Sequence, residues 1–179
     1  MMKKIYTPLS TQGLSKLKAG DEVLLSGIIY TARDQAHKRL CESIKKKKKL
    51  PFELSGAVIY YCGPTKTPKG LAIGSCGPTT SSRMDAFAPL LIKNGLKAMI
   101  GKGGCSQEVC AAIKKHKAIY FLAFAGCGAL LSGCVKKATA FTYADLGPEA
   151  IVKLEVEDFP LIVGIDAKGN SVYRARAPK

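Results

Sequence analysis

The sequence predicts a single mixed α/β domain covering residues 1–179. Three observations support this fold class. β-Rich runs and segments of helical periodicity are mixed along the whole chain, and no internal repeat or linker divides it. The length suits one domain with a sizeable core, and 47% hydrophobic with 23% charged residues is typical of a globular protein.

The first part of the chain contains strands on either side of a helix. Residues 21–30 are rich in β-formers and predict a strand that begins at a Gly-Asp turn. Apolar residues at helical spacing then predict an amphipathic helix from about Asp34 to a run of lysines. Residues 56–62 predict a strong strand that stops at a Gly-Pro pair, and residues 71–74 predict a further short strand.

The middle of the chain alternates loops, helices and short strands. Residues 77–83 form a polar loop that leads into a helix, and Pro89 predicts a kink or break in that helix. Residues 98–100 predict a short strand, which runs into the glycine-rich segment 101–104. A helix from Ser106 to roughly residue 115 follows.

Residues 118–135 are apolar over about the length that spans a bilayer. Three glycines interrupt the segment, and it has no flanking aromatic belt. A buried strand at residues 118–124, followed by a glycine turn and a short helix, explains it better than a membrane span.

The C-terminal part is more β-like. Residues 139–143 predict a strand, and residues 154–159 predict an extended segment. Residues 161–165 and 171–173 flank a turn-forming segment and predict a hairpin.

The charge balance is strongly basic. Lys and Arg outnumber Asp and Glu by 28 to 13, giving a net charge of +15. Nucleic-acid binding, attraction of small anions and docking on an acidic partner all agree with this balance. The run Lys45–Lys49 is typical of a solvated helix end. The interleaved aromatics and GXXG clamp of common RNA-binding modules are absent, so nucleic-acid binding is disfavoured.

The chain has seven cysteines, an odd number. Together with an N-terminal segment that lacks the apolar stretch of a signal peptide, this predicts free thiols in a reducing, cytoplasmic setting. No CxxC pair occurs, so ordinary zinc spacings are missing and small apolar core filler is the favoured interpretation. We therefore predict no metal ligands in this chain. The cysteines are Cys41, Cys62, Cys76, Cys105, Cys110, Cys127 and Cys134.

Three polar segments each follow a predicted strand: residues 31–38, 77–83 and 101–106. In α/β sheets, ligands gather beyond the carboxyl ends of strands, so these loops are expected to share one pocket. Glycine-rich turns that lead into helices present free N–H groups to an anion.

The same loops carry Arg33, Arg83 and Lys102. An arginine can hold a carboxylate through two parallel hydrogen bonds, so the set predicts a site for a small carboxylate or phosphate. His37 lies one helical turn from Arg33, and three roles are open to it: orienting Arg33, reaching the substrate, or pairing with Asp34. The sequence has no phosphate-loop or GxSxG motif.

Six blocks in a fixed order resemble the β subunit of class I iron–sulfur fumarate hydratases and L(+)-tartrate dehydratases, from about Tyr6 to Tyr173. A chance match of all six is very improbable. The blocks are Thr31-Ala32-Arg33-Asp34-x-Ala36-His37, Tyr61-x-Gly63-Pro64, Gly77-Pro78-Thr79-Thr80-Ser81-x-Arg83-Met84-Asp85, Gly101-Lys102-Gly103-Gly104, Leu146-Gly147-Pro148-Glu149-Ala150 and Leu154-Glu155-Val156-Glu157-Asp158-Phe159-Pro160.

The resemblance implies a three-layer β/β/α swivelling domain with its core at about residues 6–173. It implies a hydro-lyase that reversibly hydrates fumarate to (S)-malate, with conversion of L(+)-tartrate to oxaloacetate as the alternative. Activity would require a partner, an α subunit or a separate N-terminal domain, that holds a [4Fe–4S] cluster through three cysteines. With an α subunit, the assembly would be α2β2 or similar. The cysteines of this chain lie outside the family's cluster-binding segments.

The resemblance also implies roles for individual residues. The implied substrate-binding residues are Arg33, Arg83, Lys102 and Thr80. The implied catalytic base is Thr79, and Asp34 and His37 would tune Thr79 or Arg33. A threonine hydroxyl is a weak base, so it would depend on a cation-rich pocket of low dielectric.

Two other functions remain as alternatives. A basic nucleic-acid-binding module would bind through residues 45–49 and lose affinity with salt. A free-standing carboxylate-binding domain would keep the pocket without a catalytic partner.

Overall fold

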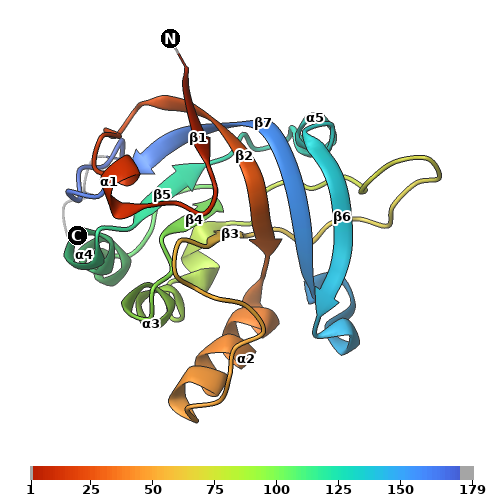
Figure 1. Cartoon of the computed structure of the whole chain (residues 1–179), viewed down its shortest axis with the longest axis horizontal. Helices are drawn as coiled ribbons and strands as arrows, with labels where there is room; N and C mark the ends of the chain where they lie inside the picture. Colours follow the sequence, from red (N-terminus) through yellow and green to blue (C-terminus); the bar gives the residue numbers. More distant parts are fainter. Residues whose placement is uncertain (1, 174–179) are drawn as a thin grey trace, which may run out of the picture.

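The computed structural model describes residues 2–173 as a mixed α/β domain built on a seven-stranded sheet (Figure 1). The predicted mixed α/β class is confirmed. The strands are β1 (Lys3–Tyr6), β2 (Glu22–Thr31), β3 (Val58–Tyr60), β4 (Ala98–Gly101), β5 (Ile119–Leu122), β6 (Val135–Thr142) and β7 (Ile151–Ile165). The helices are α1 (Thr11–Leu14), α2 (Asp34–Lys45), α3 (Ala88–Lys93), α4 (Gln107–His116) and α5 (Gly128–Ser132), with 3-10 turns η1 (Ser81–Met84) and η2 (Ala144–Glu149).

The sheet closes on itself. Its strand order is β1-β2-β3-β4-β5-β7-β6, and an additional pairing between β2 and β7 joins β2, β3, β4, β5 and β7 into a ring. Strands β1 to β5 pair in parallel, whereas β7 is antiparallel to β2, β5 and β6. Because parallel strands end at the same edge, the loops after β2, β3 and β4 leave the sheet together.

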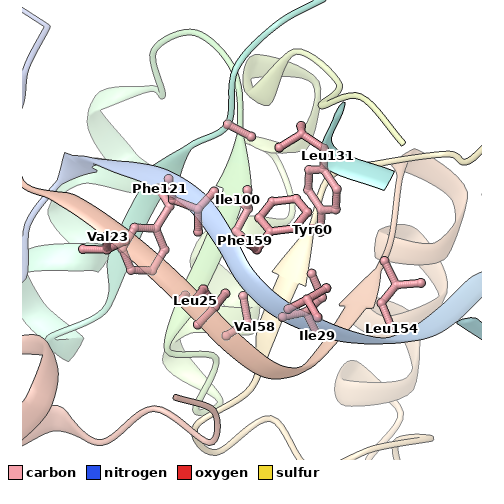
Figure 2. Close-up of a cluster of buried hydrophobic side chains, with 14 of the residues drawn as sticks. Val23, Leu25, Ile29, Val58, Tyr60, Ile100, Phe121, Leu131, Leu154 and Phe159 are labelled. Carbon is pink, nitrogen blue, oxygen red and sulfur yellow. The ribbon is translucent and has the colours of Figure 1, made fainter. Parts of the chain in front are cut away.

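The parallel strands β3, β4 and β5 are buried on both faces. Within β3, Val58 and Tyr60 belong to a core inside the ring, while Ile59 belongs to a second core beneath the helices. Figure 2 shows the inner core, in which the rings of Tyr60 and Phe159 meet edge to face with centroids 5.5 Å apart. Burial of a side chain of this size contributes roughly 1.5–3 kcal/mol, so the two cores fix the sheet and hence its loop edge.

Helices α2, α3 and α4 cover the outer face of these strands (Figure 1). Helix α2 buries Ala36, His37, Leu40 and Cys41 and exposes its other side, as its apolar spacing predicts. Pro89 stands in the first turn of α3, separate from η1, so the predicted break is confirmed. Proline is tolerated there because the first helical N–H groups have no intrahelical acceptor.

Residues 118–135 divide into β5, a turn and α5, as predicted. Within residues 2–173, the helices are all too short or too polar to cross a bilayer.

Three sequence expectations need correction. Residues 71–74 form no strand; they lie in a long excursion between β3 and η1, in which Leu71 is 59% exposed (yellow in Figure 1). The two extended C-terminal segments are one strand, β7, which continues through Pro160. Residues 171–173 meet β7 only through an isolated bridge between Ile165 and Ser171.

Candidate functional site

Arg33 lies at the point where β2 turns into α2. It is the N-cap residue of α2, with extended backbone geometry, and its side chain is 24% exposed. The guanidinium passes directly over the backbone of Gly63: a Cβ at that position would lie 2.8 Å from Cδ and Nη1 of Arg33 and 3.0 Å from the carbonyl oxygen of Pro148. Gly63 therefore provides the space in which this arginine lies.

Asp34 joins the two predicted arginines. Its Oδ1 accepts a hydrogen bond of 3.0 Å from Nε of Arg83, and its Oδ2 lies 2.9 Å from Nη2 of the same side chain. Oδ2 also lies 4.0 Å from Nε of Arg33. The carboxylate thus holds two cations from different loops side by side, and Arg83, 48% exposed, remains open to a ligand.

The loop that carries Thr79 runs alongside the loop that carries Lys102. The Lys102 N–H donates to the Thr79 carbonyl at 3.4 Å, and the Ser81 N–H donates to the Lys102 carbonyl at 3.0 Å. Thr80 and Lys102 form an isolated parallel bridge that extends the pairing of the strands. Thr79 and Lys102 are half-buried and Thr80 is exposed.

Two further contacts fix these loops. The Thr79 N–H donates to the carbonyl of Tyr61, just past β3, at 2.6 Å. A Cβ on Gly101 would lie 2.0 Å from Oγ of Ser81, so only glycine allows the two loops to approach this closely. Beneath them, the Tyr120 hydroxyl donates to the Gly103 carbonyl at 2.9 Å and lies 2.6 Å from Ser81 Oγ.

His37 supports Arg33 from the interior. Its ring is fully buried and meets Tyr61 edge-on, with centroids 5.1 Å apart. Nδ1 lies 2.9 Å from the Arg33 carbonyl, which can only accept, so Nδ1 carries the proton. Burial lowers the pKa of His37 to about 4, so the ring is neutral near pH 7.

The structure brings the predicted residues together at one edge of the sheet. Asp34 links Arg33 to Arg83, and backbone hydrogen bonds link the loops of Thr79 and Lys102. Their chemical roles stay predictions at this point.

Sequence reasoning assigned no role to Glu149, which also lies at this edge. Its Oε1 is 3.8 Å from Nη2 of Arg33, and its Oε2 accepts a hydrogen bond of 2.8 Å from the Gln35 N–H. The sequence offered one signal for it. Glu149 is an acidic residue within one of the six blocks, in a chain that has 13 acidic residues against 28 basic ones.

The thiols of this chain do not fit an iron–sulfur cluster, which needs converging thiolates. Burial raises the pKa of Cys76 to about 11, and it raises the pKa of Cys62 and of the half-buried Cys105 as well. Among residues 2–173, no three His, Cys, Asp or Glu side chains are grouped to hold a metal ion.

Two arginines on either side of a carboxylate, beside two paired loops, give this α/β domain a cationic sheet edge whose donors suit a small anion. Comparison with known protein families narrows this class: the family model described as Fumarase C-terminus matches residues 3–176. The chain belongs to this family.

The chain is also similar to one relative of about its own length and to two that are about three times longer. It is 42% identical over 178 residues to an L(+)-tartrate dehydratase subunit beta of Methanocaldococcus jannaschii, covering 96% of this chain and 91% of that protein. It is 40% identical to fumarate hydratase 2 of Leishmania major, covering 90% of this chain but 29% of the relative. It is 41% identical to the aerobic class I fumarate hydratase of Escherichia coli K12, covering 97% of this chain and 31% of the relative.

Proposed function

We propose that this chain is the β subunit of a hydro-lyase that interconverts fumarate and (S)-malate. The observation that carries the proposal is the Arg33–Asp34–Arg83 bridge at the edge where the loops of Thr79 and Lys102 pair. A four-carbon dicarboxylate has two anionic ends, which suits two arginines held at a fixed separation.

Each predicted residue has a task in this reaction. Arg33 and Arg83 bind the two carboxylates, with Lys102 and Thr80 as additional donors. In the dehydration direction, Oγ1 of Thr79, as the alkoxide, accepts the proton from C3 of malate, the electron pair of that C–H bond forms the C2–C3 double bond of fumarate, and the C2 hydroxyl leaves as hydroxide. The cluster of the partner would supply the Lewis acid that accepts this hydroxide. The cations nearby favour the deprotonated form of this weak base.

Asp34 and His37 act on the arginines in this proposal. Asp34 keeps Arg83 next to Arg33, and the neutral His37 ring holds the Arg33 carbonyl and therefore the start of α2. Both are positioning residues, because His37 is fully buried and Asp34 is engaged with Arg83.

The working enzyme would contain a second component. Its [4Fe–4S] cluster would be bound by an α subunit, since the thiols described above do not converge. The subunit name of the Methanocaldococcus relative supports a two-subunit enzyme, and the fumarate hydratases that are about three times longer support a fused equivalent. We infer an α2β2 or similar assembly, a cytoplasmic location, and a fold of the three-layer β/β/α swivelling type.

L(+)-Tartrate is the alternative substrate. The relative named as a tartrate dehydratase subunit matches this chain over 91% of its length, so it resembles this chain in size as well as sequence. Tartrate carries one more hydroxyl than malate, and both substrates have the two carboxylates that the arginines require.

The test is coexpression with a cluster-bearing α subunit, followed by an absorbance assay on fumarate, malate and tartrate. We expect Thr79→Ala to lower kcat by about 10²–10⁴-fold, the range of general acid–base catalysis. We expect Arg83→Ala to raise KM by at least about tenfold, since it removes a charge-assisted contact.

Ser82→Ala is the matched control, because Ser82 is exposed and stands between the tested positions. It should retain wild-type activity. Full activity of Thr79→Ala would remove the proposed base, and a wild-type pair inactive on all three acids would remove the proposed function.

A further inference from the structure

Glu149 lies in η2, the connection between β6 and β7, yet it contacts the beginning of α2. The register pairs Thr142 with Ile151, so the hairpin of β6 and β7 ends here and delivers η2 to the helix. The side chain of Glu149 is 21% exposed. No local sequence feature of α2 predicts this contact, because 114 residues separate Glu149 from Gln35.

The two carboxylate oxygens of Glu149 have different partners. Oε2 accepts the backbone N–H of Gln35 at 2.8 Å. The N-cap of α2 is Arg33, whose side chain makes no capping hydrogen bond, so Glu149 caps the helix from outside. Oε1 lies 3.8 Å from Nη2 of Arg33, close enough for attraction but too far for a hydrogen bond.

The Arg33 side chain is therefore held in place, but its hydrogen-bonding capacity is not fully used. The backbone of Gly63 lies against it, and Nε is buried with no hydrogen-bond partner among the described residues. Asp34 and Glu149 lie 4.0 and 3.8 Å away. Donors of the guanidinium thus remain available to a carboxylate ligand.

Glu149 has two opposing effects on such a ligand. By holding the start of α2, it keeps Arg33 in place and reduces the ordering that binding would otherwise require. Its negative charge, however, repels the ligand and partly neutralises Arg33. An amide at this position would keep an acceptor for the Gln35 N–H and remove the repulsion.

Resting on the proposed function, we propose that Glu149 is a positioning residue that fixes Arg33 and also limits the affinity of the site for dicarboxylates. The opposing effects give the proposal a distinctive signature. Glu149→Ala raises KM for malate about tenfold, because both the cap and the confinement are lost. Glu149→Gln gives a KM no higher than wild type, and about threefold lower at low salt, because only the repulsion is lost.

The kinetic experiment uses the enzyme reconstituted with its cluster-bearing subunit. Asp145→Asn is the matched control: it lies in the same turn and pairs with Arg39 rather than Arg33. Its KM should stay within twofold of wild type. A Glu149→Ala enzyme with wild-type KM, or a Glu149→Gln enzyme as impaired as Glu149→Ala, would overturn the proposal.

A second measurement on the full chain needs no activity and separates this proposal from the proposed function. Phenylglyoxal reacts with accessible arginines, and mass spectrometry can map the rate at each position. We expect Glu149→Ala to increase the rate at Arg33 several-fold and to leave Arg39 unchanged. An unchanged rate at Arg33 would contradict the confinement even if the reconstituted enzyme is fully active.

Discussion

His37 is a titratable residue that lies fully buried beneath this edge of the sheet. Its ring is fully buried beside Tyr61, and Nδ1–H is committed to the Arg33 carbonyl. Nε2 has no hydrogen-bond partner among the described residues, so a second proton there would be charged and unsolvated. The ring therefore contributes to the site as a neutral group.

This environment predicts a pH dependence of stability. The pKa of His37 is about 4 in the folded chain and near 6.5 when unfolded, so the unfolded state binds the proton first as pH falls. Stability from this group is complete above pH 6.5 and is lost as pH falls toward 4, by up to roughly 3 kcal/mol.

Urea denaturation between pH 7 and pH 4.5 measures this loss. His37→Asn, which retains a side-chain N–H for the Arg33 carbonyl, should be less stable at pH 7 but should lose less stability over the same range. Equal losses in the two proteins would show that His37 does not titrate in this window.

Two glycines of the site are each explained by a single close contact. Gly63 and Gly101 are required by what lies against them, Arg33 in one case and Ser81 in the other. In both places a neighbouring side chain occupies the volume that a Cβ would fill. These glycines are therefore part of the site, as the charged residues are.

Among the elements, the pairing of two loops depends on Tyr120 in β5. Its hydroxyl donates to the Gly103 carbonyl, so the Ser81 hydroxyl must be the donor to Tyr120. One buried oxygen thus connects the loop of Thr79 to the loop of Lys102.

Tyr120→Phe should lower the free energy of unfolding by about 1–3 kcal/mol, because it leaves buried groups on both loops without a partner. We also expect lower hydro-lyase activity, since Thr79 and Lys102 lose their common support. Urea denaturation and the coupled assay measure the two effects. The control is Tyr30→Phe, whose ring stacks on Phe52 in another part of the fold; comparable losses in both variants would contradict a specific role for Tyr120.

Several strands could be predicted from sequence patterns alone. The strands β3, β4 and β5 were predictable, because each is a short run of apolar residues ended by glycine, proline or polar residues, and β2 was predictable from its many β-forming residues after a Gly-Asp turn. Their parallel pairing puts the loops after β2 and β4 at one edge, which is why Arg33 and Lys102 were predictable together. Thr79 and Arg83 were expected to follow a strand at residues 71–74 that does not form; their loop returns to the same edge after the excursion from β3 and is held there by its contacts with Tyr61 and Lys102.

Other elements depend on contacts distant in sequence. Strand β1 is short and lysine-rich, and it exists because it pairs with β2. Strand β7 continues through Pro160 because Asp158 adopts a positive φ of 49° and its N–H bonds to Ser26 Oγ, so the strand bends without ending. Glu149 likewise has a role only through its contacts with α2, which no pattern in its own segment reveals.

For the whole molecule, closure of the ring brings a fourth segment to the site. β7 pairs with β2 along one edge and with β6 and then β5 along the other, so the turn between β6 and β7 lies next to the start of α2. The site edge is therefore built from the ends of β2, β3 and β4 together with η2. A sheet left open between β2 and β7 would not bring Glu149 to Arg33.

The net charge of +15 is also a property of the whole molecule, and the structure separates part of it from the site. Residues 45–49 are exposed at the C-terminal end of α2, whereas Arg33 and Asp34 are at its N-terminal end. A helix of 12 residues is about 18 Å long, roughly twice the Debye length at physiological ionic strength. Charge at the far end therefore acts weakly on a ligand at Arg33.

Replacing Lys46, Lys47 and Lys49 by Gln lowers the net charge from +15 to +12 (15 − 3). With the α subunit present, we expect KM for malate within about twofold of wild type at physiological salt, because the substrate site keeps both of its arginines. Steady-state kinetics at low and physiological salt provide the measurement.

The same variant tests the nucleic-acid alternative. That function requires the wild type to retain RNA in a salt-dependent way and the substitutions to abolish the retention. A KM raised more than fivefold at physiological salt would instead mean that these lysines act directly on the substrate, and would contradict the separation of the basic helix end from the site.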